Sequence, residues 1–249
     1  MKRCVRCLLM AGFFATRLGA SQDEDLFSRG NAAFSSGKYL EAVQAFQSLT
    51  QQGDPSPEVL FNLGNSEFRA GDTGHAVLYY ERALWMVPQD PDIRANLKFV
   101  QRAAGIFETE GSWWKKLVDA WTLNQWSMLA LAVWIVLCSL VAWRLVRRNR
   151  RSRLNAAVGC AAIALALFVT VVYLKSADLD AAVVVVPDAS LKVAPIENSP
   201  SLHPIPAGTR VDIKKDRGEF VYVETLDEKR GWMKVGQVDW IVPRSRLRP

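Results

Sequence analysis

Two long apolar runs organise this chain, WSMLALAVWIVLCSLVAW at residues 126–143 and AAVGCAAIALALFVTVVYL at residues 156–174. Neither run contains a charged residue, and each is about long enough to cross roughly 30 Å of hydrocarbon as a helix. The sequence therefore predicts a transmembrane hairpin with helices at 126–146 and 154–175 and an arginine-rich loop at 147–153. The arginines in and beside this loop are Arg144, Arg147, Arg148, Arg150, Arg151 and Arg153.

Short arginine-rich loops stay in the cytoplasm when such a hairpin inserts. We therefore expect the loop to be cytoplasmic. The chain on both sides of the hairpin is then expected on the periplasmic or outer side of a bacterial cytoplasmic (inner) membrane. At the N-terminus, basic residues, an apolar run at 7–15 and the small residue Ala20 follow the order of a secretory signal. This predicts a signal peptide at 1–20, with an uncleaved first anchor as the alternative.

Charge is distributed unevenly along the chain. The formal net charge is +6, but residues 21–112 carry thirteen acidic and seven basic side chains, and residues 178–249 carry eleven of each. The positive excess therefore lies in the N-terminal segment and around the loop, where it indicates membrane topology. Nucleic-acid binding would need a basic face on a folded domain, so we expect no nucleic-acid partner.

A six-residue motif occurs twice, thirty-four residues apart: RGNAAF at 29–34 and LGNSEF at 63–68. The positions that follow it recur as well, Gly37 as Gly71, Ala42 as Ala76, and Phe46 as Tyr80. Small residues let two helices approach closely, and an aromatic ring fills the space between them. The glycines suit the left-handed conformation that ends a helix.

This period of paired helices resembles the tetratricopeptide repeat. The resemblance implies an all-α domain at 21–110, with repeats at about 23–56 and 57–90 and a cap helix at 91–104. It also implies a concave face, lined by the first helix of each repeat, that binds peptides or proteins. The residues expected on that face are Phe27, Asn31, Phe34, Phe61, Asn65, Phe68 and Arg69. Whether their aromatic rings line a groove or only pack the interior stays open.

Residues 112–124 are rich in tryptophan and contain Lys115 and Lys116. Tryptophan and lysine suit the headgroup region, so a short interfacial helix is expected there. Neither charge-free run, 126–143 or 156–174, contains an acidic or basic residue of the kind that marks a transport path. The hairpin is therefore interpreted as an anchor.

Short valine-rich runs separated by turn residues follow the hairpin and predict a small all-β barrel, with strands expected at 181–186, 191–194, 210–214, 220–224 and 231–234. Their order resembles a bacterial SH3-like domain at 181–243, with residues 185–195 as the opening hairpin. Leu191–Ala194 stands where that family carries an Asn-Val-Arg motif linked to cell-wall binding. Tyr222 and Trp232 are the candidate surface residues, and Trp232 is alternatively a core residue.

The sequence predicts no catalytic site. The only histidines, His75 and His203, lie in different domains, and neither has a nucleophile or carboxylate spaced for a triad or a metal site. No phosphate-binding glycine loop is present. We therefore expect no enzyme activity, no cofactor, no bound metal and no small-molecule substrate.

The order of parts, a signal, two repeats with a cap, a two-helix hairpin and a terminal barrel, resembles the BatE proteins of the bacterial aerotolerance operon. The residues that carry this resemblance are Asn31, Asn65, the DIRANL run at 92–97 and the NQW run at 124–126. It implies a membrane-anchored scaffold in an oxidative-stress or envelope complex with von Willebrand factor A-type proteins and a MoxR-type ATPase. Binding of peptidoglycan through the barrel is the alternative, and regulation of an envelope hydrolase is a weaker third.

Overall fold

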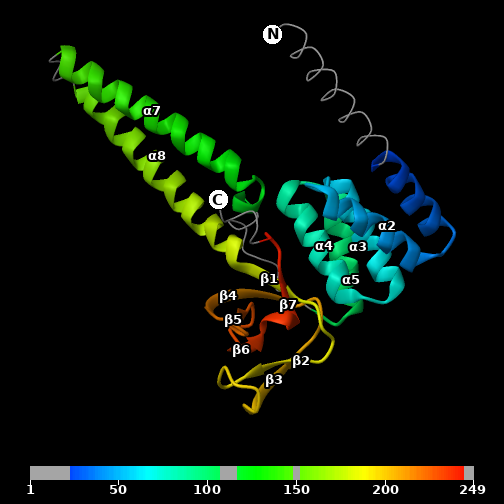
Figure 1. The fold of residues 1–249 in the computed structure, drawn as a ribbon. Helices are drawn as coiled ribbons and strands as arrows, with labels where there is room; N and C mark the ends of the chain where they lie inside the picture. The colour runs from blue at the N-terminus through cyan, green and yellow to red at the C-terminus, as the bar shows by residue number, and fades with distance from the viewer. Residues whose placement is uncertain (1–22, 107–116, 148–151, 244–249) are drawn as a thin grey trace, which may run out of the picture.

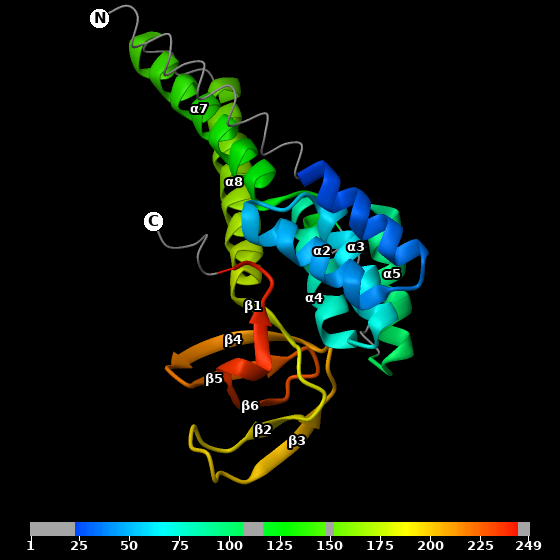
Figure 2. The same ribbon diagram turned by 45° about the vertical axis from the view of Figure 1, so that its right-hand side comes forward.

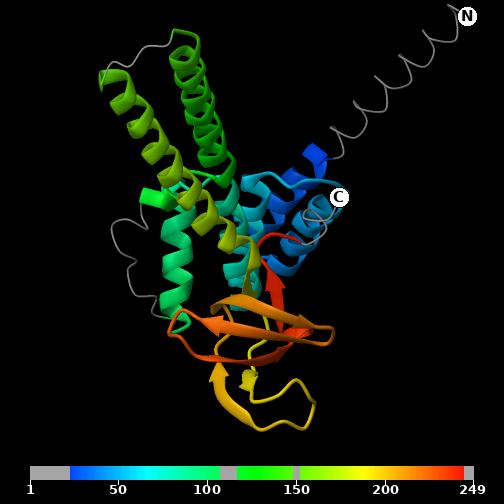
Figure 3. The ribbon, with the colours of Figure 1, turned by 90° about the vertical axis from the view of Figure 1, so that its left-hand side faces the viewer.

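The structure, a computed structural model, describes residues 23–106, 117–147 and 152–243 of the 249-residue chain. It consists of a block of paired helices, a long two-helix hairpin and a curled antiparallel sheet (Figure 1). The hairpin projects from the side where the helical block meets the sheet, and Figures 2 and 3 show this arrangement from two further directions. The predicted signal peptide at 1–20 lies outside the described residues.

The helical block, hereafter the repeat domain, shows the thirty-four-residue period in its element bounds. A first helix at 23–35 is followed by α2 (Tyr39–Gln52), α3 (Pro57–Ala70), α4 (Thr73–Met86) and α5 (Pro91–Ala103). Both α3 and α5 begin with proline at the first helical position, preceded by a capping side chain from Ser56 or Asp90. Helix pairs therefore repeat, as the sequence predicts.

The period extends into α5. Gly37, Gly71 and Gly105 stand thirty-four residues apart and have φ angles of 76°, 96° and 71°. Only glycine adopts this left-handed conformation without strain, so each residue ends a helix in the same way. The segment expected to be a cap is thus placed and terminated like the first helix of a third repeat.

Close packing within each pair depends on the small residues. A β-carbon at Gly30 would lie 2.7 Å from the ring of Phe46, and one at Gly64 would lie 3.0 Å from the ring of Tyr80. Phe46 and Tyr80 are almost fully buried. These glycines therefore let aromatic rings from the second helices reach the backbone of the first helices.

The hairpin consists of α7 (Leu123–Arg147) and α8 (Ser152–Ser176), which are long and apolar enough to cross a membrane. At about 1.5 Å per residue, each is about 37 Å long. Upstream of α7, residues 117–119 are helical and a turn follows, so within its described part the expected interfacial helix at 112–124 is interrupted. Residues 112–116 of that segment lie outside the described residues.

The remainder, hereafter the sheet domain, is one curled sheet in the order β3-β2-β6-β5-β4-β1-β7, with all neighbours antiparallel. Its strands are β1 (Ala181–Val184), β2 (Ala189–Lys192), β3 (Ser201–Ile205), β4 (Arg210–Arg217), β5 (Phe220–Thr225), β6 (Arg230–Lys234) and β7 (Val238–Trp240).

The expected opening hairpin at 185–195 is wrong, because β1 and β2 do not pair. β1 pairs with β4 and β7, whereas β2 pairs with β3 and β6. Two strands, β3 and β7, were not predicted. β3 is an edge strand that contains Pro204 and exposes four of its five residues, and β7 has only three residues. Neither has the buried, alternating pattern that identifies a strand in a sequence.

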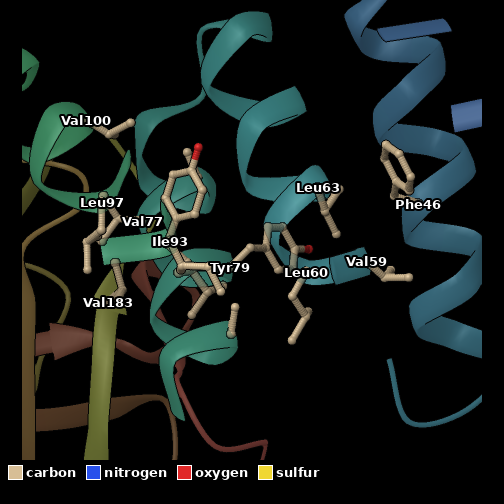
Figure 4. Packing of buried hydrophobic residues seen from close by; sticks show 14 of the residues in the cluster. Phe46, Val59, Leu60, Leu63, Val77, Tyr79, Ile93, Leu97, Val100 and Val183 are labelled. Atoms are coloured by element: carbon tan, nitrogen blue, oxygen red, sulfur yellow. The ribbon is translucent and has the colours of Figure 1, made fainter. Parts of the chain in front are cut away.

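Strand β1 belongs to two hydrophobic cores. Successive side chains of a strand point to opposite faces. Ala181 and Val183 join the core of the repeat domain, whereas Ala182 and Val184 join the core of the sheet domain, and all four are fully buried. Figure 4 shows Val183 beside Val77 and Leu97 of the repeat domain. The sheet domain therefore covers the apolar surface left at the end of the helical repeats.

Ion pairs surround this junction and the base of the hairpin. Arg210 of β4 contacts Glu81 of α4 at 3.4 Å and Asp178 of η1 (Ala177–Asp180) at 2.8 Å. Lys175, near the end of α8, contacts Asp119 at 2.9 Å and Asp178 at 3.6 Å, and its side chain is 8% exposed. This network links the segment before α7, the end of α8, the sheet domain and the repeat domain.

Candidate functional site

The face built from the first helix, α3 and α5 carries a repeated asparagine contact. The side-chain amide of Asn62 donates to Asn31 Oδ1 at 3.3 Å, and that of Asn96 donates to Asn65 Oδ1 at 3.1 Å. Both members of the first pair recur thirty-four residues later in the second. We call these four residues the asparagine ladder. It brings amide groups from the first helix, α3 and α5 to one face, where they can bond an extended backbone.

Asn65 has a second bond that limits what it can offer to a ligand. The hydroxyl of Tyr80 donates to Asn65 Oδ1 at 2.7 Å, and burial raises the pKa of this hydroxyl, which keeps it protonated. An amide oxygen has two lone pairs, so Tyr80 and Asn96 together occupy it. The amide nitrogen of Asn65 is therefore the part that can meet a ligand.

Phe27 and Phe61 are half-buried and pack against aromatic rings of the repeat-domain core. Phe27 packs edge-on against Phe46 with ring centroids 5.8 Å apart, and Phe61 packs against Tyr80 at 6.0 Å. Their rings extend the interior of the repeat domain. Of the two interpretations that the sequence left open, packing therefore describes these two phenylalanines.

More aromatic surface lies near the ends of the first helix, α3 and α5. Phe34 packs against Tyr39 at 5.5 Å, and Phe68 packs edge-on against Phe99 at 5.7 Å. Phe99 is 60% exposed, which is unusual for a phenylalanine in a helical domain. Here an apolar ring next to the ladder faces solvent.

Arg69 brings a positive charge to the same end. Its guanidinium lies 4.7 Å from the centre of the Tyr39 ring and donates to the Tyr39 hydroxyl. The side chain remains exposed. Stacking restricts the guanidinium without neutralising it, so this end of the face suits an acidic or carboxylate-bearing group.

The sequence prediction missed Asn62, Asn96 and Phe99. The period contained the signal for the first two, because Asn96 is Asn62 shifted by thirty-four residues. Phe99 occupies the position of Asn65 one period later. It was missed because α5 was interpreted as a cap rather than as a third lining helix.

His75 lies at the start of α4 in a small charged group. Its Nδ1 is 2.7 Å from Asp72 Oδ2, and its ring stacks on Tyr79. The hydrogen bond with Asp72 raises the pKa of His75 despite partial burial. For Asp72, burial acts to raise the pKa, but its bonds with His75 outweigh it and the pKa is lowered. The pair caps α4, since Asp72 also accepts from the His75 backbone N–H.

Tyr222 and Trp232 lie next to each other on neighbouring strands of the sheet domain. Their ring centroids are 5.2 Å apart, and the guanidinium of Arg217 lies 5.4 Å from the centre of the Trp232 ring. Trp232 is only 8% exposed, yet it lies outside the main core of the sheet domain. It is therefore a buried residue of a separate aromatic cluster, and Tyr222 presents more of its surface to solvent.

Three of the six arginines predicted to set the topology belong to the described ends of α7 and α8. Arg144 is exposed on α7, while Arg147 and Arg153 belong to the facing ends of α7 and α8. Arg148, Arg150 and Arg151 lie outside the described residues. Across residues 23–106, 117–147 and 152–243, no group of three or more histidine, cysteine, aspartate or glutamate side chains could hold a metal ion.

No protein-family model matches this chain, and no curated protein matches it.

Proposed function

We propose that this protein is a membrane-anchored scaffold whose exported tetratricopeptide repeats bind partner proteins. The asparagine ladder with the exposed ring of Phe99 is the observation that carries the proposal. Amide groups at regular spacing suit the backbone of a bound segment, and an exposed aromatic ring suits an apolar anchor on the partner. The protein acts by binding rather than by catalysis.

The resemblance to BatE proteins adds the class of partner. In this proposal the repeats hold von Willebrand factor A-type membrane proteins in an aerotolerance or envelope-stress complex that includes a MoxR-type ATPase. The hairpin restricts the encounter to the membrane plane and so raises the effective concentration of the partners. The terminal domain is an SH3-like barrel that closes the repeat array.

The proposed location is the cytoplasmic (inner) membrane of a bacterium, with both folded domains on the outer side. The repeat domain and the sheet domain lie at one end of the hairpin (Figure 1), and the ends of α7 and α8 that contain Arg144, Arg147 and Arg153 form the other end. A phosphatase reporter that works only outside the cytoplasm should be active when fused after Pro249. The same reporter inserted after Arg150 should be inactive, and the reverse pattern would refute this orientation.

Crosslinking in native membranes tests the binding face. We expect Phe99→Ala combined with Asn31→Ala to abolish crosslinking to proteins that contain a von Willebrand factor A domain, with membrane levels unchanged. Asn65 stays intact in this variant because it holds Tyr80. Leu226→Ala is the matched control, since Leu226 is a 48% exposed apolar residue on the sheet domain. Undiminished crosslinking in the double variant would refute the face as the binding site.

Binding of peptidoglycan is the second candidate function, and the cluster of Arg217, Tyr222 and Trp232 favours it. Tyr222 and Arg217 can contact a sugar or a stem-peptide carboxylate, whereas Trp232 supports them from below. The full chain in detergent would then sediment with purified sacculi, and Tyr222→Ser would release it. Sedimentation that is absent, or is unchanged by Tyr222→Ser, excludes this role for the cluster.

A further inference from the structure

The end of α8 leads directly into the folded domains. α8 ends at Ser176, η1 follows at once, and β1 begins at Ala181. Lys175 also pairs with Asp119 in the segment before α7. The hairpin has no flexible linker at this end. The short connection from α8 to β1 therefore limits the distance between the sheet domain and the end of the hairpin.

Helix α4 runs toward the base of the hairpin. Gly74, near its start, lies against Val185, which follows β1. Glu81, farther along α4, contacts Arg210, which also contacts Asp178 beside the end of α8. α4 is therefore antiparallel to β1, and its C-terminal end is the end nearest the hairpin.

The turn between α4 and α5 is tied to the chain segment that enters the hairpin. The side-chain amide of Gln89 donates to the carbonyl oxygen of Ala120 at 2.6 Å. Ala120 lies just before the start of α7 at Leu123. The turn therefore lies beside the base of the hairpin, at the same position along the hairpin axis.

The end of α4 and the turn that follows it have the composition of a membrane-contacting surface. Leu84 to Pro88 are five consecutive apolar residues, the last three of α4 and the first two after it. Leu84 to Val87 pack with one side against the core of the repeat domain, and each of the five residues keeps part of its surface in solvent. Trp121, in the segment bonded to Gln89, is 44% exposed. Arg94 donates to the carbonyl of Pro88, which places a guanidinium beside the apolar run. Tryptophan beside a cation suits the zone where acyl chains meet phosphate headgroups.

We propose that residues 84–88 lie in the headgroup region of the leaflet from which the hairpin emerges, so that a lipid surface is the partner of this turn. The inference rests on the proposal that α7 and α8 span a membrane. It implies that the first helix, α3 and α5 have their N-terminal ends at the bilayer. Their C-terminal ends, where Phe99 lies, then point away from the bilayer.

Collision measurements on single spin labels in the full chain test the proposal. Cys4, Cys7, Cys138 and Cys160 are replaced by serine or alanine, and a label is attached to Met86→Cys or, as a second site, Val87→Cys. The protein is reconstituted in vesicles of phosphatidylcholine and phosphatidylglycerol. Oxygen concentrates in the bilayer and a charged nickel chelate stays in water, so the ratio of their collision rates reports the depth of the label.

Leu40→Cys is the matched control. Leu40 is 69% exposed and lies at the start of α2, thirty-four residues before Gly74, so it is at the far end of the repeat domain. Val136→Cys, at a 53% exposed position within α7, reports the span itself. We expect a ratio of oxygen to nickel collisions at position 86 that is several-fold higher than at position 40 and lower than at position 136.

Three outcomes would overturn the inference in distinguishable ways. Equal ratios at positions 86 and 40, with a high ratio at 136, would show that the turn is in water although the hairpin spans the bilayer. Few collisions of either reagent at positions 86 and 87 would show that protein, either the core of the repeat domain itself or a second copy, covers the turn in place of lipid. A low ratio at position 136 would refute the membrane span on which the inference rests.

Discussion

Gly74 of α4 lies so close to Val185 that a β-carbon at position 74 would stand 2.6 Å from the Val185 carbonyl oxygen. The nearest atoms belong to backbone, so neither side can yield by a change of rotamer. This contact joins the repeat domain to the sheet domain at the end of β1. Glycine is required at position 74 because the backbone of Val185 occupies the space that a β-carbon would fill.

Gly74→Ala should therefore destabilise the protein. In a free helix the change from glycine to alanine stabilises by roughly 0.5–1 kcal/mol, but overpacking costs about 1–3 kcal/mol. The expected result is a lower Tm of the full chain in detergent micelles, measured by circular dichroism. Gly236→Ala is the control, since a β-carbon there meets nothing within 4 Å. An unchanged or higher Tm for Gly74→Ala would contradict the close contact.

Asn65→Ala should lower stability more than Asn31→Ala. The hydroxyl of Tyr80, a residue that is 1% exposed, would lose its acceptor, and a buried unsatisfied group costs about 1–3 kcal/mol. Asn31 is exposed, so its loss should change the free energy of unfolding by a few tenths of a kcal/mol. Urea unfolding measures both.

The variant Tyr80→Phe supplies the test of mechanism. If the missing acceptor causes the loss, Asn65→Ala should cost much less in a Tyr80→Phe background. Equal costs in the two backgrounds would mean that Asn65 acts through another contact.

The repeat domain should not be stable by itself. Residues 23–106 expressed alone would expose Val77 and Ile106, because β1 and the turn at Gly208 no longer cover them. A repeat buries its core against its neighbours, so an uncovered end is poorly soluble. We expect aggregation on size exclusion and strong binding of a hydrophobic dye. A monomeric fragment with a cooperative thermal transition would contradict the covering role of the sheet domain.

Lys175→Gln should cost more than Lys214→Gln. The Lys175 side chain is 8% exposed and pairs with Asp119 and Asp178, whereas the Lys214 side chain is 44% exposed beside Asp212. Exposed pairs contribute about 0–1 kcal/mol, but charge-assisted bonds of a buried lysine contribute about 1.5–3 kcal/mol. Thermal unfolding in nanodiscs compares the two variants. Equal losses of Tm would argue against a buried network at the base of the hairpin.

Stability should depend on pH through His75. The folded pKa is raised above 6.5 by Asp72, so this contribution is complete below pH 6.5 and is lost as pH rises through the raised value. His75→Gln should therefore flatten the fall in Tm above pH 6.5. Glu67 and Asp239 also favour the protonated ring, whereas burial opposes it.

Asp72→Asn should flatten the same slope, because it removes the main cause of the raised pKa. Asp72 itself has a lowered pKa and contributes stability above pH 3.8 that is lost as pH falls. The window above pH 6.5 therefore reports His75 rather than Asp72. An unchanged slope in both variants would contradict the pairing.

Much of the helical architecture could be predicted because its signals are local. The period of thirty-four residues predicted paired helices, and Gly37 and Gly71 predicted where the first helices end. The charge-free runs predicted two helices long enough to cross a membrane. The strands were predicted less completely, because β3 and β7 have no strong pattern and depend on the strands beside them.

The candidate site was predicted only in part. The asparagines at 31 and 65 were identified from the motif, whereas the sequence left open whether the rings of Phe27 and Phe61 line a groove or pack the interior. In the structure both rings are half-buried against Phe46 and Tyr80. A helical sequence gives the angle of a residue about the axis but not the distance to the next helix, and that distance decides whether a ring is covered. The contribution of α5 was missed because that segment was interpreted as a cap.

By itself the sequence determined the helix pairs, the ends of the first helices and the two apolar helices of the hairpin. These depend on periodicity, on glycine conformation and on charge-free length, which neighbouring residues specify. Only the tertiary structure decided that β1 divides its side chains between two cores and that the sheet domain closes the repeat domain. Those contacts join Val183 to Val77 and Arg210 to Glu81, residues more than a hundred positions apart. Such pairs follow from packing in space, which no local pattern of residues encodes.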